Sequence, residues 1–205
     1  MGKQLKHRIL LGLWAMTLLM ITGCSSTKYV PEGAYLLDEL NVHSDNKEVK
    51  PSDLSMFIRQ QPNTKWFNLI KTQLYIYNMS GRDTTKWVNR ALRRMGDEPV
   101  IFDSYETERS RQEVEKAVRN LGYLGASVDA GTQLRVTKKI ALSYDIKTGR
   151  PYKVRSIHYD IPDTTIWNYM RQDSAATLLS EGMNMDINVL DSERERITSL
   201  LQKNG

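Results

Sequence analysis

Few residues of this chain have the types and spacing that catalysis requires. Its 205 residues include one cysteine and three histidines, His7, His43 and His158. The sequence has no HExxH zinc motif, no G-x-S-x-G nucleophile, no phosphate-binding glycine loop and no Cys/His pattern with metal-ligand spacing. Neighbouring acids such as Asp97 and Glu98 are common on solvated loops. The sequence therefore disfavours an enzyme, and we predict no catalytic residue, no cofactor and no metal ligand.

The single cysteine, Cys24, follows a segment with the features of a secretion signal. Three basic residues precede the apolar run Ile9–Ile21, which is too short to span a bilayer comfortably. We predict a signal peptide over residues 1–23, cleaved between Gly23 and Cys24. Its removal takes away three basic residues and no acidic ones, so the net charge falls from +5 to +2. A nucleic-acid-binding protein would keep a basic stripe, so we predict no nucleic-acid partner.

The residues Ile21-Thr22-Gly23-Cys24 resemble the lipobox of bacterial lipoproteins, in which the cysteine becomes the first mature residue and carries the lipid. A lone cysteine cannot form an intramolecular disulfide, and lipidation gives this thiol a use. Each buried methylene of an acyl chain contributes about 0.8 kcal/mol to membrane binding, so palmitate-type chains would hold the protein on a membrane. The alternative is an ordinary signal peptide that ends near a cysteine. Ser25–Lys28 lacks acids, which by resemblance to lipoprotein sorting signals favours the outer membrane over the inner one.

The elements that must position any binding residues centre on Thr107–Gly149. Apolar residues recur there at helical spacing, at Val114, Ala117, Val118 and Leu121. We expect Arg111, Glu115 and Arg119 to face water, and we expect the helix to end at Asn120–Gly122 because glycine favours the left-handed conformation of helix C-termini.

Two strands follow this helix. The first is predicted over Ala126–Val136, with a bend or bulge at Gly131, and the second alternates in polarity over Ile140–Ile146. The two meet around Thr137–Lys139, so we predict an antiparallel hairpin.

Upstream, we predict a strand over Tyr35–Val42 and a helix over Pro51–Ile58 that stops before Gln61-Pro62-Asn63. Between this helix and the central one, two apolar stripes have helical spacing: Trp66, Leu69, Ile70, Leu74 and Tyr77, then Trp87, Val88, Ala91, Leu92 and Met95. We expect both stripes to be core, and a membrane-surface helix or a partner groove is the alternative.

The downstream part partly repeats this order. A strand is predicted over Tyr152–Ile161, a helix starts at Pro162-Asp163-Thr164, and a last helix is capped by Asp191-Ser192. A shift of 83 positions lays Ser110–Gly122 over Glu193–Gly205, which favours tandem small modules; chance similarity of two amphipathic helices is the alternative.

These elements predict an α+β fold of tandem modules with the order β-α-α-β-β. A helical crossover permits parallel pairing of the first strand and the hairpin pairs antiparallel, so each module has a three-stranded mixed sheet with two helices on one face. We predict a tether over residues 24–34, a first module with a helical insertion over 35–149 and an incomplete second module over 150–205. We expect the natural protein to continue past Gly205.

The sequence resembles the BamA/TamA family of outer-membrane assembly factors, in particular its lipoprotein variant TamL. The modules resemble the periplasmic POTRA domains that precede a membrane β-barrel in that family. The likeness is carried by the lipobox with TKYVPEGAYLL, by Arg59–Asn63, Tyr77-Asn78, Gly96–Val100, Asn120–Tyr123, Gly149–Tyr152 and Glu193–Ile197. The helical insertion around Trp66–Met95 and the incomplete second module depart from the family pattern.

The resemblance implies a lipid-anchored protein on the periplasmic face of the outer membrane that binds unfolded outer-membrane proteins or partners in the assembly machinery. The physical means would be β-augmentation, in which a client strand pairs with a sheet edge. The candidate edge is the first hairpin strand, at Ala126, Val128, Ala130, Leu134 and Val136. The alternative is an edge kept unreactive by Asp129, Gly131 and Arg135. A freestanding structural or partner-binding lipoprotein is the alternative function.

Overall fold

The computed structural model describes residues 26–67, 70–135 and 138–204. The chain forms two compact units that interleave along the sequence. One comprises the described residues among those up to Asn41, Gln60–Asp103 and Thr132–Leu142. The other comprises Val42–Arg59, Ser104–Gly131 and the residues from Ser143 onward.

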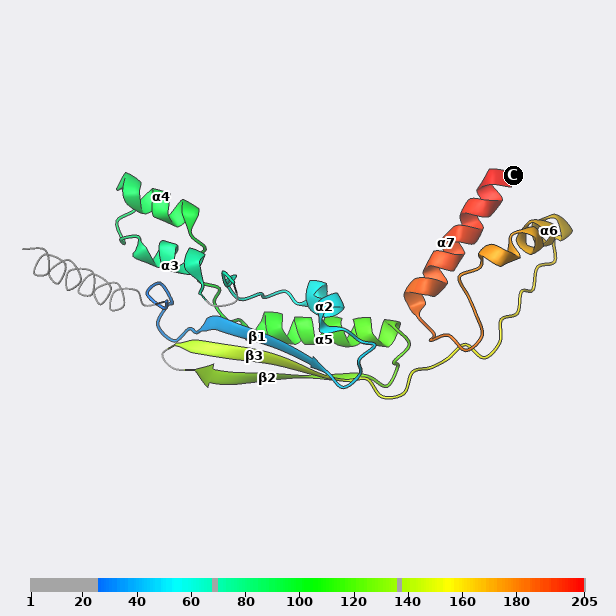
Figure 1. The fold of residues 1–205 in the computed structure, drawn as a ribbon, viewed down its shortest axis with the longest axis horizontal. Helices are drawn as coiled ribbons and strands as arrows, with labels where there is room; N and C mark the ends of the chain where they lie inside the picture. The colour runs from blue at the N-terminus through cyan, green and yellow to red at the C-terminus, as the bar shows by residue number, and fades with distance from the viewer. Residues whose placement is uncertain (1–25, 68–69, 136–137, 205) are drawn as a thin grey trace, which may run out of the picture. The chain divides into compact units, whose positions relative to one another are not determined.

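One three-stranded sheet contains β1 (Leu36–Ser44), β2 (Ser127–Arg135) and β3 (Lys139–Lys147). Their order is β1-β3-β2, with β3 in the middle (Figure 1). Leu36 N donates to Lys138 O at 2.8 Å and Asp45 N donates to Ile146 O at 3.2 Å, so β1 and β3 advance together and are parallel. The strand after a helical crossover therefore pairs as predicted.

The hairpin of β2 and β3 is also present. Lys147 Nζ lies 3.2 Å from Asp129 Oδ2, and Ser143 Oγ donates to Gly131 O at 3.4 Å, so positions rise along β2 as they fall along β3. The pair is antiparallel, and the sheet is mixed. This confirms the α+β fold with a three-stranded mixed sheet.

The core lies on the predicted face of β3, where Ile140, Leu142, Tyr144 and Ile146 are all buried. Helix α5 (Ser104–Asn120) covers this face with Val114, Ala117 and Val118, which are buried as predicted. Tyr144 Oη donates to Thr107 O at 3.1 Å, and burial raises the pKa of Tyr144. Gly122 has a φ of 94°, which confirms the left-handed end of the helix.

The predicted helix over Pro51–Ile58 is a short α-helix, α2 (Pro51–Leu54), continued by the 3-10 turn η1 (Ser55–Phe57). Leu54 and Ile58 are buried, as expected for its inner face. η1 packs against α5, and Figure 1 draws α2 and α5 on one side of the sheet. The order strand, helix, helix, strand, strand is therefore present.

The insertion forms two helices, α3 (Thr72–Met79) and α4 (Trp87–Met95), which pack against each other. The prediction of a helix from Trp66 was wrong, because Trp66 and Ile70 instead form an antiparallel bridge and are 67% and 56% exposed. Leu69 lies outside the described residues, and of the described residues of that stripe Leu74 and Tyr77 are buried, in α3. The prediction that the second stripe is core was also wrong, because α4 has no buried residue.

Side-chain hydrogen bonds tie the two ends of the insertion together and join it to β1. Gln60 Nε2 donates to Ile101 O at 2.9 Å, and Asn63 Nδ2 donates to Glu98 O at 2.7 Å. Lys71 Nζ, almost fully buried, donates to Asp38 O at 2.6 Å and to Asp38 Oδ1 at 3.0 Å. Burial lowers the pKa of Lys71; burial would raise the pKa of Asp38, but the hydrogen bond and charge of Lys71 outweigh it and lower that pKa.

The downstream part is helical in the described residues: α6 (Thr164–Gln172), the 3-10 turn η2 (Ser174–Ala176) and α7 (Ile187–Asn204). α6 starts where predicted, and Asp163 caps it by accepting from Thr165 N and Ile166 N.

Two predictions for this downstream part were wrong. Residues 152–161 form no strand; they make one bridge, between Lys153 and Asn184, and their backbone hydrogen bonds to residues 182–185 end at Val154. The last helix starts before Asp191, since Asp186 Oδ1 already accepts from Asn188 N at 2.8 Å.

Candidate binding site on the free edge of the sheet

The strand predicted to bind clients, β2, lies at an edge of the sheet. The opposite edge, β1, is covered where it begins. Leu37 N donates to Val100 O and Phe102 N donates to Tyr35 O, both at 2.8 Å, which adds a short antiparallel segment alongside the strand. No described segment pairs with the outer side of β2 in this way. Its backbone is therefore the better template for another chain.

Two arginines of α5 cover the first part of this edge. Arg111 Nη1 donates to Val128 O at 3.2 Å, and Arg119 donates to Ala126 O from both Nε and Nη2, at 3.3 and 3.2 Å. Glu115 lies between the two arginines and pairs with both, at 2.8 and 2.7 Å. The first carbonyl groups of the edge therefore already have hydrogen-bond donors.

The arginine contacts also reveal which way the strand points. Val128 and Ala126 are two residues apart, so their carbonyl groups point in the same direction. A side chain from α5 reaches carbonyls only on the side of β2 that β3 does not occupy. By the same alternation, the N–H and C=O groups of Ala130, Thr132 and Leu134 point outward.

Arg111 and Arg119 were predicted to face solvent, and that prediction missed their contacts with β2 and with acids of α5. Arg111 is held by Glu108 at 2.7 Å as well as by Glu115. The hydrogen bonds of Glu108 and Glu115 raise the pKa of Arg111, and the hydrogen bond of Arg111 lowers the pKa of Glu108 to about 2. The spacing of Arg111, Glu115 and Arg119 by four residues is the sequence signal for one charged stripe along the helix.

The remaining part of β2, Ala130–Arg135, is the free edge. Leu134 is 64% exposed, and Ala130 and Thr132 are exposed as well. Arg135 pairs with Glu39 at 2.9 Å and Asp129 pairs with Lys147 at 3.2 Å. These ion pairs cross the outer face of the sheet and leave the strand backbone open, which is the feature a pairing strand requires.

The five predicted edge residues thus separate into different environments. Ala126 and Val128 are buried, so substitutions there would test the core. Ala130 and Leu134 are exposed on the free edge. Val136 lies outside the described residues.

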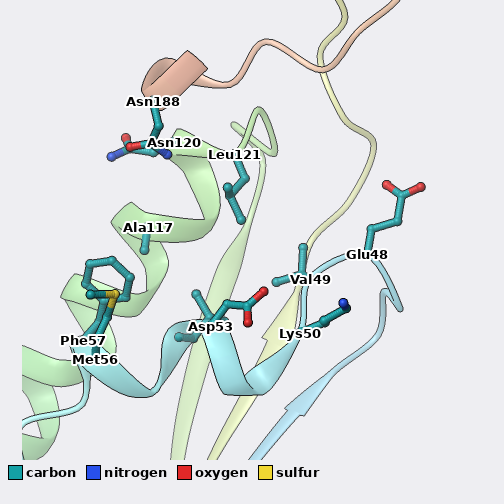
Figure 2. Close-up of a pocket in the computed structure, with 11 residues that line it drawn as sticks. Glu48, Val49, Lys50, Asp53, Met56, Phe57, Ala117, Asn120, Leu121 and Asn188 are labelled. Atoms are coloured by element: carbon teal, nitrogen blue, oxygen red, sulfur yellow. The ribbon is translucent and has the colours of Figure 1, made fainter. Parts of the chain in front are cut away.

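A groove of about 350 Å³ lies between η1 and the end of α5. Figure 2 shows Ala117 and Leu121 on one side of it and Asp53 and Phe57 on the other. Met56 at its rim is 80% exposed. The groove is lined mainly by apolar side chains, and Glu48, Lys50 and Asp53 are the charged residues of its lining.

The histidines and one of the acids considered in the search for catalytic residues can be placed in the structure. His43 and His158 are exposed, and Glu98 accepts a hydrogen bond from Tyr77 Oη at 2.8 Å. Among the described residues, no group of three or more His, Cys, Asp or Glu side chains is arranged to hold a metal ion. The same residues include no helix that is both long and apolar enough to cross a bilayer.

The predicted signal peptide, its cleavage between Gly23 and Cys24, and lipidation at Cys24 lie outside the described residues. The described chain starts just beyond them, and it is packed from Lys28 onward. Lys28 Nζ donates to Asn78 O at 2.9 Å and to Ser80 O at 2.7 Å, and Tyr29 Oη donates to Ser80 O at 2.6 Å.

Comparison with known proteins gives a limited result. No protein-family model matches the chain, and no curated protein matches it in sequence. Among solved structures, the chain is similar to the crystal structure of Haemophilus influenzae BamA POTRA3-5, with 16% sequence identity over 86% of this chain and 89% of that chain. The TM-score is 0.28. This score is well below 0.5, and the fold is defined by its own strand order, β1-β3-β2.

Proposed function

We propose that this chain is a lipid-anchored, POTRA-like region that binds extended protein segments by β-augmentation at the free edge of β2. The observation that supports it is the division of that edge: its start is covered by Arg111 and Arg119, and Ala130–Arg135 stays open. A strand that pairs with backbone groups binds clients of many sequences. Unfolded outer-membrane proteins, or a partner in the assembly machinery, are the clients we propose.

The order β1, α2 with η1, α5, β2 and β3 supports the POTRA-like assignment. We propose residues 35–149 as the first module, with α3 and α4 as its insertion, and residues 150–205 as part of a second module. The resemblance of the chain to the TamL variant supports a lipoprotein anchored through Cys24 on the periplasmic face of the outer membrane. The role we propose is binding, without catalysis.

The test of the edge uses Thr132, whose N–H points outward and whose side chain is exposed. Thr132→Pro removes that donor from the free edge, and proline is tolerated on edge strands. Thr132→Val keeps the N–H and is the matched control. A photo-crosslinking residue at Leu134 should capture unfolded outer-membrane protein in the parent and in Thr132→Val, and capture should fall strongly in Thr132→Pro.

Equal crosslinking in all three proteins would contradict augmentation at this edge and favour the alternative of a structural or partner-binding lipoprotein. Circular dichroism of each variant reports whether the sheet is retained. If the sheet is intact and crosslinking is lost, the loss results from the changed backbone of the edge.

The anchor has a separate test. Cys24→Ala removes the thiol that would carry the lipid, so we expect this variant to leave the membrane fraction. Retention of Cys24→Ala in membranes would contradict the lipoprotein assignment and leave the edge proposal unaffected.

A further inference from the structure

Helix α4 packs on the protein through its polar side. Asn89 Oδ1 accepts from Gly81 N at 2.8 Å, and Asn89 Nδ2 donates to Asp83 O at 2.6 Å. One turn later, Arg93 donates to Ser80 Oγ at 3.3 Å and to Gly81 O at 3.2 Å. Amphipathic helices of globular domains normally make such contacts with their apolar face, whereas α4 makes these hydrogen bonds with polar side chains.

Part of the apolar side of α4 lies in solvent, while Ala91 and Leu92 on that side are half-buried. Trp87, Val88 and Met95 are 74%, 45% and 67% exposed. At 3.6 residues per turn these three side chains lie within about 100° of one another around the helix axis. A contiguous apolar surface that includes an exposed tryptophan marks an interaction site.

Positive charge borders this apolar surface. Lys86, Arg90 and Arg94 are exposed, and the residues from Lys86 to Gly96 include no acid. None of these three cations pairs with an acid in the part of the chain that the structure describes. The surface therefore suits a partner that is apolar inside and anionic at its boundary.

The start of the chain lies close to this helix. Lys28 and Tyr29 bind the backbone of Ser80, and Arg93 of α4 lies over the Tyr29 ring at 5.1 Å. Cys24 is four positions before Lys28, and an extended chain of four residue steps spans at most about 14 Å. A lipid on Cys24 would thus keep a bilayer within reach of α4.

We propose that α4 lies in the interface of the bilayer that carries the anchor, with Trp87, Val88 and Met95 at the level between headgroups and acyl chains and Arg90 and Arg94 on anionic phosphates. Helices with a basic polar side and an apolar side that includes tryptophan bind membranes in this way. The inference rests on the proposed lipid anchor. It assigns the helical insertion a role of its own, which is to hold the module at a set orientation on the membrane.

The test places a fluorophore on α4 of the mature, acylated protein. Acylated Cys24 does not react with thiol probes, so Val88→Cys supplies the one reactive thiol, and Glu195→Cys on α7 is the control. The labelled proteins are reconstituted in vesicles of phosphatidylethanolamine and phosphatidylglycerol, and quenching by aqueous iodide is measured. We expect a several-fold slower quenching at position 88 than at 195, and loss of that protection in Arg90→Glu/Arg94→Glu and in phosphatidylcholine vesicles.

Each other outcome overturns the inference. Equal quenching at 88 and 195 in the acylated protein shows that α4 does not touch lipid. Protection at 88 that persists in detergent and rises with protein concentration assigns the surface to a second copy or another protein. Mass spectrometry of the first mature residue is the independent measurement, because an unacylated Cys24 contradicts the anchor itself.

Discussion

Helices α5 and α4 have similar amphipathic patterns and opposite environments. α5 buries Val114 and Val118 completely against the sheet. α4 contacts the protein through Asn89 and Arg93 and leaves Trp87 74% exposed. The periodicity of a helix identifies its apolar side and does not identify what covers that side.

The two helices also show two ways of attachment. α5 is held by removal of apolar area from water, a contribution that grows with every buried side chain. α4 is held by a few hydrogen bonds and by Gly96 at its end, which lies against the backbone of α3. We therefore expect the two helices to respond differently to the same substitution.

The largest contrast should come from the same change in each helix. Val118→Asp places an unpaired charge where the side chain is fully buried, and we expect a loss of about 3–5 kcal/mol in the free energy of unfolding. Val88→Asp changes an exposed position of α4, and we expect a change within about 0.5 kcal/mol. Urea denaturation of both variants measures the difference, and equal losses would show that α4 is packed like α5.

The attachment of α4 through Gly96 is the next test. A Cβ at Gly96 would lie 2.6 Å from Gln73 O and closer still to Tyr77 N, so Gly96→Ala must displace backbone, and we expect a loss of about 1–3 kcal/mol. Gly125→Ala is the matched control, since nothing lies within 4 Å of its Cβ position. Thermal unfolding measures both, and a Gly96→Ala protein as stable as Gly125→Ala would contradict the close approach of α4 to α3.

The third helix, α7, extends the comparison because its buried residue is an acid, Glu193. The hydrogen bond of Arg196 holds the pKa of Glu193 at about 2, below its ordinary 4.5, with further bonds from Leu178 N and Thr177 Oγ1, both at 2.9 Å. Since the folded-state pKa is lowered, this stabilisation is complete above pH 4.5 and is lost as the pH falls toward 2.

We expect the loss on acidification to be about 2 kcal/mol of local stability, seen as faster hydrogen exchange at the amide of Leu178. In Glu193→Gln the amide of Leu178 should already be weakly protected from hydrogen exchange at neutral pH, and its protection should change little on acidification. An amide of Leu178 that exchanges at the same intrinsic-rate-corrected speed from pH 6 to pH 2.5 would contradict the role of this carboxylate.

The smallest expected effects concern single polar contacts of the two helices. Asn89→Ala removes both contacts of that side chain, and we expect about 1 kcal/mol of local stability to be lost and exchange in α4 to accelerate. Tyr144→Phe removes one buried hydrogen bond to α5, and we expect the free energy of unfolding to fall by about 1 kcal/mol. Hydrogen exchange should not accelerate in α5 alone. Faster hydrogen exchange in α5 than in α4 would contradict the conclusion that α4 is the less firmly attached helix.

Sequence patterns predicted best where the covering partner is close along the chain. The helix with Val114 and Val118 is followed directly by the hairpin it packs on, so periodicity, a terminal glycine and alternation all agreed with the structure. Prediction failed at Tyr152–Ile161 and at Trp66–Ile70, where apolar spacing suggested elements that the described chain does not form. A strand needs a neighbouring ladder, and local spacing carries no information about that neighbour.

The free edge was predicted in part. The alternation of Ala126–Val136 predicted a strand, and this first hairpin strand was the candidate edge. The covering of Ala126 O and Val128 O by two arginines was missed, because side chains with a spacing of four on a helix are expected on a solvated face.

The sequence by itself determined the local elements of this protein: the helix over Ser104–Asn120, the hairpin that follows it and the parallel crossover from the first strand. These depend on periodicity, glycine conformation and connection geometry, which are properties of neighbouring residues. Only the tertiary structure decided which apolar surfaces are covered and which backbone groups stay open. That decision depends on contacts between residues far apart in the chain, and so α4 is left with an exposed apolar side and the end of β2 with a free edge.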